Sequence, residues 1–179
     1  MVIMKKDIIL VDRNDKIIGY DEKYPPHKNP AKLHRAFSIF LFNDKGQMLI
    51  HKRSKYKKTW PGYWTNACCS HPAKGESYAK ALQRRLKEEL GIRCKLKFLF
   101  KFIYKAKYNK TWGEHEIDYV FVGRYNKKIK PNKKEIADWK YMDVDSLLKD
   151  VKKNPERYTP WFKKALPRVI KYIKKNQDF

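Results

Sequence analysis

The stretch Trp60-Pro61-Gly62-Tyr63-Trp64-Thr65-Asn66-Ala67-Cys68-Cys69-Ser70-His71-Pro72 brings two tryptophans, two adjacent cysteines and a histidine together in one short segment. Its prolines and its glycine exclude a regular helix, because proline removes a backbone donor and clashes with the preceding turn. In extended chain, side chains two residues apart share a face, so Cys69 and His71 should point the same way and Cys68 the opposite way. Trp60 and Trp64 are expected near the thiol, either as walls of a pocket or as packing. The stretch is therefore interpreted as a reaction centre.

The clearest regular element follows this stretch, at residues 76–90. Its apolar residues recur three and four positions apart, as on the core-facing side of a helix: Ala79, Leu82, Leu86 and Leu90. Ser77 is suited to cap the N-terminus, and Gly91 stands where a C-terminal cap belongs. The pattern predicts an amphipathic helix packed against the core.

Charged residues near the end of this helix point to a further role. Arg85 and Glu89 are four residues apart and therefore lie on one face. Glu88 and Glu89 stand near the C-terminus, where the helix dipole disfavours negative charge, so they need a compensating cation. A bound Mg²⁺ is one candidate, because this ion prefers oxygen ligands, and a solvated acidic face is the alternative.

Segments with strand patterns surround the helix. Strands are expected at residues 8–11, 16–20, 36–42, 48–50, 96–105, 114–123 and 138–144. The first two and the next two form hairpins. In the fifth segment four aromatic residues alternate and should share one face: Phe98, Phe100, Phe102 and Tyr104. A short helix is expected at 145–152 and a basic helix, interrupted by Pro167, at 160–174.

This order of elements predicts an α+β fold, a mixed β-sheet sandwich flanked by helices. At 179 residues a single domain, 1–179, is sufficient. We expect an N-terminal hairpin at 7–21, a core at about 34–145 and C-terminal helices at about 145–175.

The composition bounds the partners and the compartment. A formal net charge of +24 predicts affinity for anions, whether phosphorylated substrates, nucleic acid or an anionic membrane. Most of the lysines are spread along the chain, which is typical of a solvated surface. Three cysteines, two of them adjacent, indicate reduced thiols and a cytoplasmic location. The N-terminal residues show no signal-peptide pattern, and no segment has the roughly 18 apolar residues that a membrane-spanning helix needs.

Histidines and carboxylates offer candidate metal ligands. His27 and His34 frame a proline-rich loop, and His71 lies in the cysteine-containing stretch. Alternation along the strand at 114–123 puts Glu114 and Glu116 on one face, with His115 on the other. Imidazoles with carboxylates suit Zn²⁺, Mn²⁺ or Fe²⁺. The spacing alone leaves structural histidines and solvent-facing acids as the alternative.

Together these motifs resemble the type I isopentenyl-diphosphate isomerases, which belong to the Nudix superfamily. The resemblance runs from about Asp7 to about Lys174. Its carriers are Glu22-Lys23-Tyr24 followed by His27, Leu33-His34-Arg35-Ala36-Phe37-Ser38, Trp60-Pro61-Gly62-Tyr63-Trp64-Thr65-Asn66, Cys69-Ser70-His71-Pro72, Gly75-Glu76-Ser77, Arg84-Arg85 with Glu88-Glu89-Leu90-Gly91, Glu114-His115-Glu116 and Thr159-Pro160-Trp161. Ser70 stands where these isomerases usually have glycine. The resemblance implies a Nudix-like core.

The resemblance also implies a reaction. Isopentenyl diphosphate would become dimethylallyl diphosphate by protonation and deprotonation through a tertiary carbocation, a step of isoprenoid biosynthesis. Cys69 and Glu116 correspond to the proton-transfer pair. Tyr104 corresponds to a tyrosine bonded to the catalytic glutamate, and Trp161 to an aromatic residue that faces the carbocation.

The same resemblance assigns ligands. The residues that correspond to ligands of one divalent metal, Mn²⁺ or Zn²⁺, are His27, His34, His71, Glu114 and Glu116. Glu89 and the backbone carbonyl of Cys69 correspond to a Mg²⁺ site that bridges to the diphosphate. The cations that match the diphosphate site are Lys23, Arg53, Lys57 and Arg85. The expected partner is therefore a small diphosphate, with no protein, nucleic acid or membrane required.

Two other functions are compatible with parts of the sequence. A Nudix pyrophosphohydrolase would share the helix and a dependence on divalent metal, but Arg85 stands where its catalytic glutamate belongs. A basic RNA-binding protein would explain the net charge, but it gives no reason for three histidines and two glutamates in this set.

Overall fold

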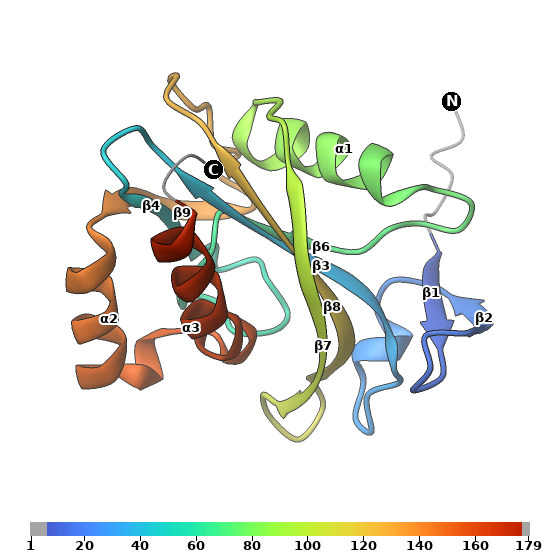
Figure 1. Cartoon of the computed structure of the whole chain (residues 1–179). Coiled ribbons are helices and arrows are strands. Elements are labelled where there is room, and N and C mark those ends of the chain that lie inside the picture. Colours follow the sequence, from blue (N-terminus) through green and yellow to red (C-terminus); the bar gives the residue numbers. More distant parts are fainter. Residues whose placement is uncertain (1–6, 177–179) are drawn as a thin grey trace.

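The computed structural model describes residues 7–176 of the chain. The N-terminal residues in which no signal-peptide pattern is found lie outside this range, except for Asp7. A central sheet separates two apolar cores (Figure 1). Helix α1 (Tyr78–Leu90) packs on one face, and helices α2 (Val144–Lys153) and α3 (Pro160–Lys175) pack on the other. The predicted α+β fold, with a mixed sheet between helices, is confirmed.

Two parallel strands, β3 (His34–Phe42) and β8 (Gly113–Arg124), form the middle of the nine-stranded sheet. Along its other edge β3 pairs in turn with β1 (Ile8–Val11), β6 (Cys68–Ser70) and β4 (Met48–Arg53). The remaining strands are β2 (Ile17–Asp21) on β1, β5 (Trp64–Thr65) and β9 (Ile136–Met142) on β4, and β7 (Lys97–Lys107) on β8. Short 3-10 helices occur at Pro25–His27 (η1) and Pro155–Arg157 (η2). Both predicted hairpins are present.

The caps of helix α1 and its end at Leu90 are as the sequence predicts, but the helix begins at Tyr78 rather than at residue 76, because Ser77 is its N-cap. The Ser77 hydroxyl accepts a hydrogen bond from the Lys80 amide, and Gly91 adopts the left-handed conformation with φ 69°. The expected core stripe is right at its three leucines but wrong at Ala79, which is exposed. In the first turn the inward contacts come from Tyr78 instead, whose ring packs against Phe37 and Tyr119.

Two further details of the prediction are wrong. A bulge between Phe98 and Phe100 breaks the alternation of β7, so Phe98 packs against Phe121 on the α1 side. The other three aromatic residues of the run pack against the core under α2 and α3. Pro167 does not interrupt α3, which continues through it, because buried side chains on both sides of it, Leu166 and Val169 among them, pack into the core and offset the cost of the proline.

Among residues 7–176, none of the helices combines the length and the apolar character that crossing a membrane demands.

Candidate active site

A pocket of about 160 Å³ opens beside the parallel strand pair. Strands β3, β6, β7 and β8, the start of α3 and the loops around η1 and β5 all contribute to its lining. The lining combines imidazoles, carboxylates, one thiol and aromatic rings with five basic side chains: Lys23, Arg53, Lys57, Lys58 and Arg85. All four cations that the sequence assigned to a diphosphate are therefore brought together.

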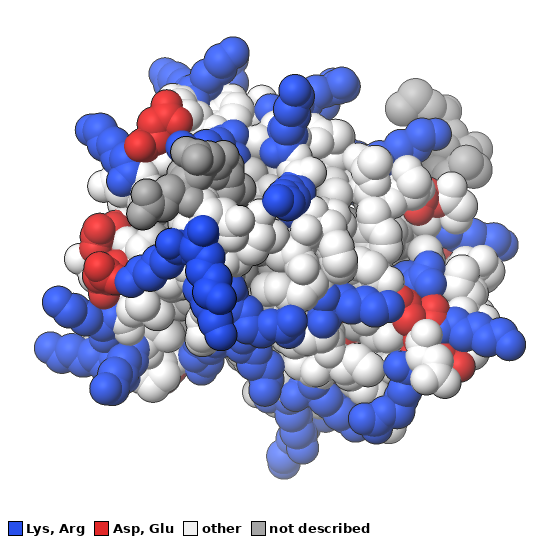
Figure 2. All heavy atoms as spheres, in the orientation of Figure 1, with Lys and Arg blue, Asp and Glu red and all other residues white. Residues whose placement is uncertain are grey.

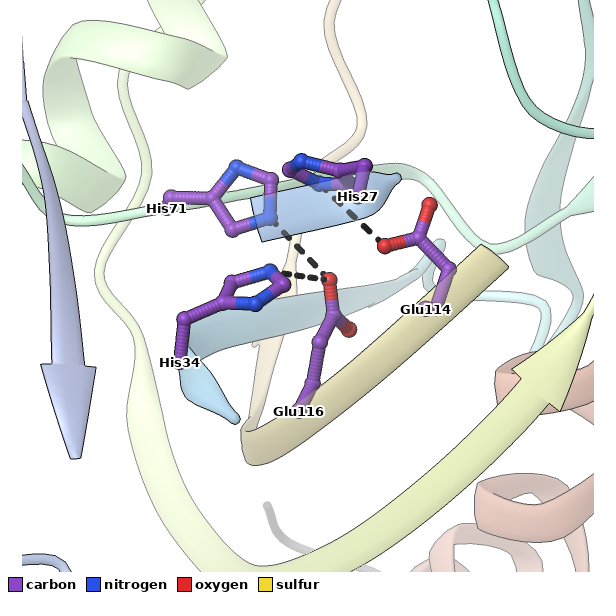
Figure 3. Close-up of side chains that lie close together, drawn as sticks. All are labelled: His27, His34, His71, Glu114 and Glu116. Atoms are coloured by element: carbon purple, nitrogen blue, oxygen red, sulfur yellow. Dashed lines mark hydrogen bonds and ion pairs between the residues drawn. The ribbon is translucent and has the colours of Figure 1, made fainter. Parts of the chain in front are cut away.

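Three imidazoles and two carboxylates point toward a common centre (Figure 3). Their ligand atoms all lie within 4.8 Å of one another. The Nε2 atom of His27 lies 3.2 Å from Glu114 Oε2, while Nε2 of His34 and of His71 lie 3.4 and 3.0 Å from Glu116 Oε1. The register of the parallel strands places His34 directly beside Glu116. The structure thus assembles the complete predicted cluster from η1, β3, β8 and the segment after β6.

Backbone carbonyls orient two of these rings. The Nδ1 atoms of His27 and His34 are hydrogen-bonded to the carbonyl oxygens of Lys23 and Lys32, at 2.7 and 2.8 Å, so that Nε2 faces the cluster. Burial and the neighbouring imidazoles lower the pKa of His27 to about 2, and burial lowers the pKa of His71 to about 4. Both rings are therefore neutral near pH 7, which is the state that binds a metal.

The carboxylates complete a donor set that fits a divalent cation. Burial and the charge of Glu116 raise the pKa of Glu114 well above its usual range. Burial acts in the same direction on Glu116, but the neighbouring imidazoles of His34 and His71 outweigh it and hold its pKa well below normal. The buried Nε2 of His34 and Oε2 of Glu114 lie 3.4 and 3.2 Å from Glu116 and His27, yet among residues 7–176 neither atom has a partner in hydrogen-bond geometry. Buried ligand atoms that lack a hydrogen bond are what a divalent metal would satisfy.

The thiol lies where the alternation of β6 predicts. Cys69 faces the pocket, and Cys68 is fully buried in the core under α1. The Cys69 thiol donates to Asn66 Oδ1 at 3.0 Å, and Trp161 Nε1 donates to Sγ at 3.1 Å. Burial raises the pKa of Cys69 to about 12, so the thiol is protonated. Ser70 pairs with Phe37 in a regular extended strand, so this position does not require glycine.

The proposed proton carriers share one pocket with two aromatic groups. The Tyr104 hydroxyl donates to Glu116 Oε2 at 2.5 Å. Trp161 is 4% exposed, and its ring centroid lies 6.2 Å from that of Tyr104. The lining does not include Trp60 or Trp64. Trp60 instead packs edge-on against Trp161 at 5.5 Å, so the packing role is the correct one for it.

The carboxylate of Glu89 is buried behind the pocket rather than in its lining. Arg85 forms an ion pair with it and also donates to Glu135 Oε1 at 3.2 Å. Burial raises the pKa of Glu89, but Arg85 and Lys57 outweigh this and lower it. The cation that the helix end requires is thus supplied by Arg85.

Two residues of the site have no role in the sequence analysis. Asn66 enters there only as part of a motif, although its Oδ1 accepts a hydrogen bond from the Cys69 thiol and its Nδ2 donates to the carbonyl oxygens of Ile39 and Cys68. Glu135 lines the pocket and was not singled out. The feature of the sequence that could have pointed to Glu135 is a single acid that follows Lys133 and Lys134 and directly precedes a strand.

Known proteins resemble this chain in sequence and in fold. The model of the NUDIX domain family matches residues 32–162. An isopentenyl-diphosphate Delta-isomerase 1 from Aromatoleum aromaticum is 43% identical over 148 residues, which cover 83% of each chain. The isopentenyl-diphosphate Delta-isomerase of Burkholderia multivorans is 39% identical over 146 residues, covering 82% of each.

Solved structures support the fold alone. The protein DR0079 from Deinococcus radiodurans superposes with a TM-score of 0.75 at 19% identity, covering 91% of this chain and 98% of that one. A MutT protein from Methanosarcina mazei gives a TM-score of 0.66, also at 19% identity, and covers 79% and 96%.

Proposed function

Since this chain belongs to the type I isopentenyl-diphosphate Delta-isomerases, which are built on a Nudix domain, it interconverts isopentenyl and dimethylallyl diphosphate, and we propose that the pocket between Cys69 and Glu116 is where it does so. The observation that carries this assignment is a thiol and a carboxylate that line one pocket together with an indole ring, the thiol protonated and the carboxylate ionised. An allylic isomerisation needs these groups and no reaction with water.

The proton balance of the reaction matches these two residues. One proton is added to the terminal alkene carbon and one is removed from the carbon on the other side of the cation. Cys69 and Glu116 each exchange one proton with the substrate, so the substrate's composition is unchanged. Tyr104 holds Glu116 Oε2, and Asn66 and Trp161 hold the thiol, so both groups are oriented before the alkene arrives.

A tertiary carbocation between these groups must be stabilised and kept from water. Trp161 is almost fully buried and lines the pocket. Its π face is worth about 2 kcal/mol toward a desolvated cation. An aromatic wall does not form a bond to the cation, so the intermediate can still lose its proton.

The basic side chains are arranged for the diphosphate. Burial lowers the pKa of Lys23, and repulsion from Lys57 and Arg85 lowers it further. Cations that repel one another in a pocket favour the binding of a polyanion, because the anion removes the repulsion. The diphosphate would therefore anchor the substrate while its alkene reacts.

The metals are part of the proposal. Three histidines and two glutamates would hold Mn²⁺ or Zn²⁺, whose positive charge would keep Glu116 in place. Glu89, which also pairs with Arg85, and the backbone carbonyl of Cys69 would hold a Mg²⁺ ion, whose charge would offset that of the diphosphate.

The decisive experiment incubates the protein with isopentenyl diphosphate and Mg²⁺ in D₂O and follows the products by NMR. We expect dimethylallyl diphosphate with deuterium in a methyl group from the wild type and none from Cys69→Ala. Cys68→Ala is the matched control and should retain activity, because that thiol faces the opposite core. Full turnover by folded Cys69→Ala would remove the thiol from the mechanism, and phosphate release in the ³¹P spectrum would indicate hydrolysis instead.

A further inference from the structure

Glu135 is an acidic residue of the pocket whose backbone is fixed from two sides. The preceding loop is attached to the end of α1, because the amides of Lys130 and Asn132 donate to the carbonyl oxygens of Leu90 and Glu89, both at 2.8 Å. On the other side, the Ser54 amide donates to the Glu135 carbonyl at 3.0 Å. Ser54 directly follows β4 and precedes Lys57 by three residues. The backbone of Glu135 is thus attached both to α1, which carries Arg85, and to the segment after β4, which carries Lys57.

Each oxygen of this carboxylate binds a different cation. Oε2 forms an ion pair with Lys57 Nζ, and Oε1 accepts from Arg85 Nη2 at 3.2 Å. The exposed fractions of the side chains are only 18% for Lys57, 12% for Arg85 and 20% for Glu135, so these pairs are shielded from water. Partial burial raises the pKa of Glu135, but Lys57 and Arg85 outweigh this and lower it to about 2. The carboxylate is ionised throughout the physiological pH range.

The two cations that Glu135 holds are the ones assigned to the substrate diphosphate. Together with Lys23 they form a group of neighbouring cations: burial lowers the pKa of Lys23, and repulsion from Lys57 and Arg85 lowers it further. Two oxygens of one carboxylate, each on its own cation, place negative charge where two phosphate oxygens would bind. Glu135 therefore supplies, inside the free pocket, the negative charge that a substrate would bring.

We propose that Glu135 is a positioning residue that stands in for the diphosphate, pairing Lys57 and Arg85 while the pocket is free and releasing them to the substrate. This inference rests on the proposed function, because it takes those cations to be the diphosphate site. Substrate and product carry the same diphosphate, so competition from Glu135 weakens the binding of both. It keeps the cations in place and speeds product release at the expense of affinity.

Two other roles predict the opposite sign. If Glu135 only braced the cations, or if it were a ligand of a Mg²⁺ ion that accompanies the diphosphate, removing its charge would weaken diphosphate binding. If Glu135 instead stands in for the diphosphate, neutralising its carboxylate should strengthen diphosphate binding, because a competitor for Lys57 and Arg85 is removed.

The test measures the affinity for inorganic pyrophosphate by calorimetry, first with EDTA and then with Mg²⁺. We expect Glu135→Gln to bind pyrophosphate about threefold to tenfold more tightly than the wild type, which is the range for losing a partly shielded charge pair. Its KM for isopentenyl diphosphate should fall, and its kcat should not rise because product leaves more slowly. Glu156→Gln is the matched control. It removes the same charge at an exposed residue outside the pocket lining and should leave the affinity unchanged.

Two further variants test the physical cause. Glu135→Asp keeps the charge and should keep the wild-type affinity within about twofold. In a Lys57→Gln background, the gain from Glu135→Gln should shrink, because one of the two competing contacts is already gone. Equal or weaker pyrophosphate binding by Glu135→Gln would overturn the inference while leaving the isomerase assignment intact. A wild type that neither binds pyrophosphate nor isomerises the substrate would instead refute the proposed function.

Discussion

The two oxygens of Glu116 have different partners. Oε1 faces the imidazoles of His34 and His71, and Oε2 accepts the hydrogen bond from Tyr104. One oxygen is therefore directed toward the proposed metal centre, and the other is held by a phenol at the pocket wall. A single carboxylate can in this way serve as a ligand and as a proton carrier without changing its orientation.

Removing the Tyr104 hydroxyl tests this division at the scale of one residue. We expect Tyr104→Phe to lower kcat about tenfold to a hundredfold with little change in KM, because a hydrogen bond to a charged group contributes about 1.5–3 kcal/mol. Steady-state kinetics with isopentenyl diphosphate is the measurement. Tyr108→Phe is the control, since its ring packs against Trp60 outside the pocket lining. An unchanged kcat in Tyr104→Phe would show that Glu116 needs no help from the phenol.

At the scale of elements, strand register places the reacting groups. The parallel pairing of β3 and β8 sets His34 beside Glu116, and the antiparallel pairing of β3 and β6 sets Ser38 beside Cys69. A slip of one residue in either pair would turn the functional side chains to the opposite face. The two cores, one on each face of the sheet, hold these registers in place.

The C-terminal end of α1 also supports the site, because the loop that precedes Glu135 is hydrogen-bonded to it. A side chain on Gly91 would strain a left-handed backbone and would place its Cβ 3.0 Å from Lys130 Cβ and 3.2 Å from the Lys130 carbonyl. We expect Gly91→Ala to lower the free energy of unfolding by about 2 kcal/mol, measured by chemical denaturation.

Gly46→Ala separates the two causes of that loss. Gly46 has φ 72°, but a Cβ there would meet nothing within 4 Å. Its cost should be about 1 kcal/mol, from the backbone conformation alone. If Gly91→Ala proved no more destabilising than Gly46→Ala, the close approach of an added Cβ to Lys130 would not contribute to the loss of stability.

At the scale of the whole molecule, the net charge of +24 has no single focus on the face shown in Figure 2. Lysine and arginine side chains are spread over that face, with a few acidic groups between them. The pocket lining accounts for only five of the 43 basic residues. A distributed positive field attracts a diphosphate from a distance, and salt should weaken that attraction.

Metal binding should be visible in the stability of the entire domain. A ligand at one hundred times its dissociation constant stabilises the folded state by about 2.7 kcal/mol. We therefore expect Mn²⁺ or Zn²⁺ to raise the Tm by about 5–10 °C over the protein in EDTA.

The same melting experiment contains its own controls. His34→Asn removes one proposed ligand and should abolish most of the rise. His115, on β8 between Glu114 and Glu116, faces away from the cluster and is hydrogen-bonded to the Ala31 carbonyl, so His115→Asn should retain the rise. An equal shift in His34→Asn would place the metal elsewhere.

Local patterns were sufficient for much of this protein. Alternation along extended chain correctly separated Cys69 from Cys68 and Glu116 from His115, because side-chain direction in a strand depends only on backbone geometry. The caps at Ser77 and Gly91 were also predictable, since a helix terminus satisfies its backbone groups with the residues next to it. The motifs of the family identified the cluster of histidines and glutamates, which spacing alone had left open.

The fold class, the caps of α1 and the five members of the histidine and glutamate cluster follow from residues and motifs of the sequence. The contacts between charges and rings at the pocket depend on the three-dimensional structure: Arg85 balances Glu89, Trp60 packs behind Trp161 rather than lining the cavity, and Glu135 pairs with both Lys57 and Arg85. The bulge at Phe98, which arises in the pairing of β7 with β8, is another feature of this kind. Each depends on contacts between segments far apart in the chain. The energy of such a contact is set by distance and burial, which no local pattern of residues specifies.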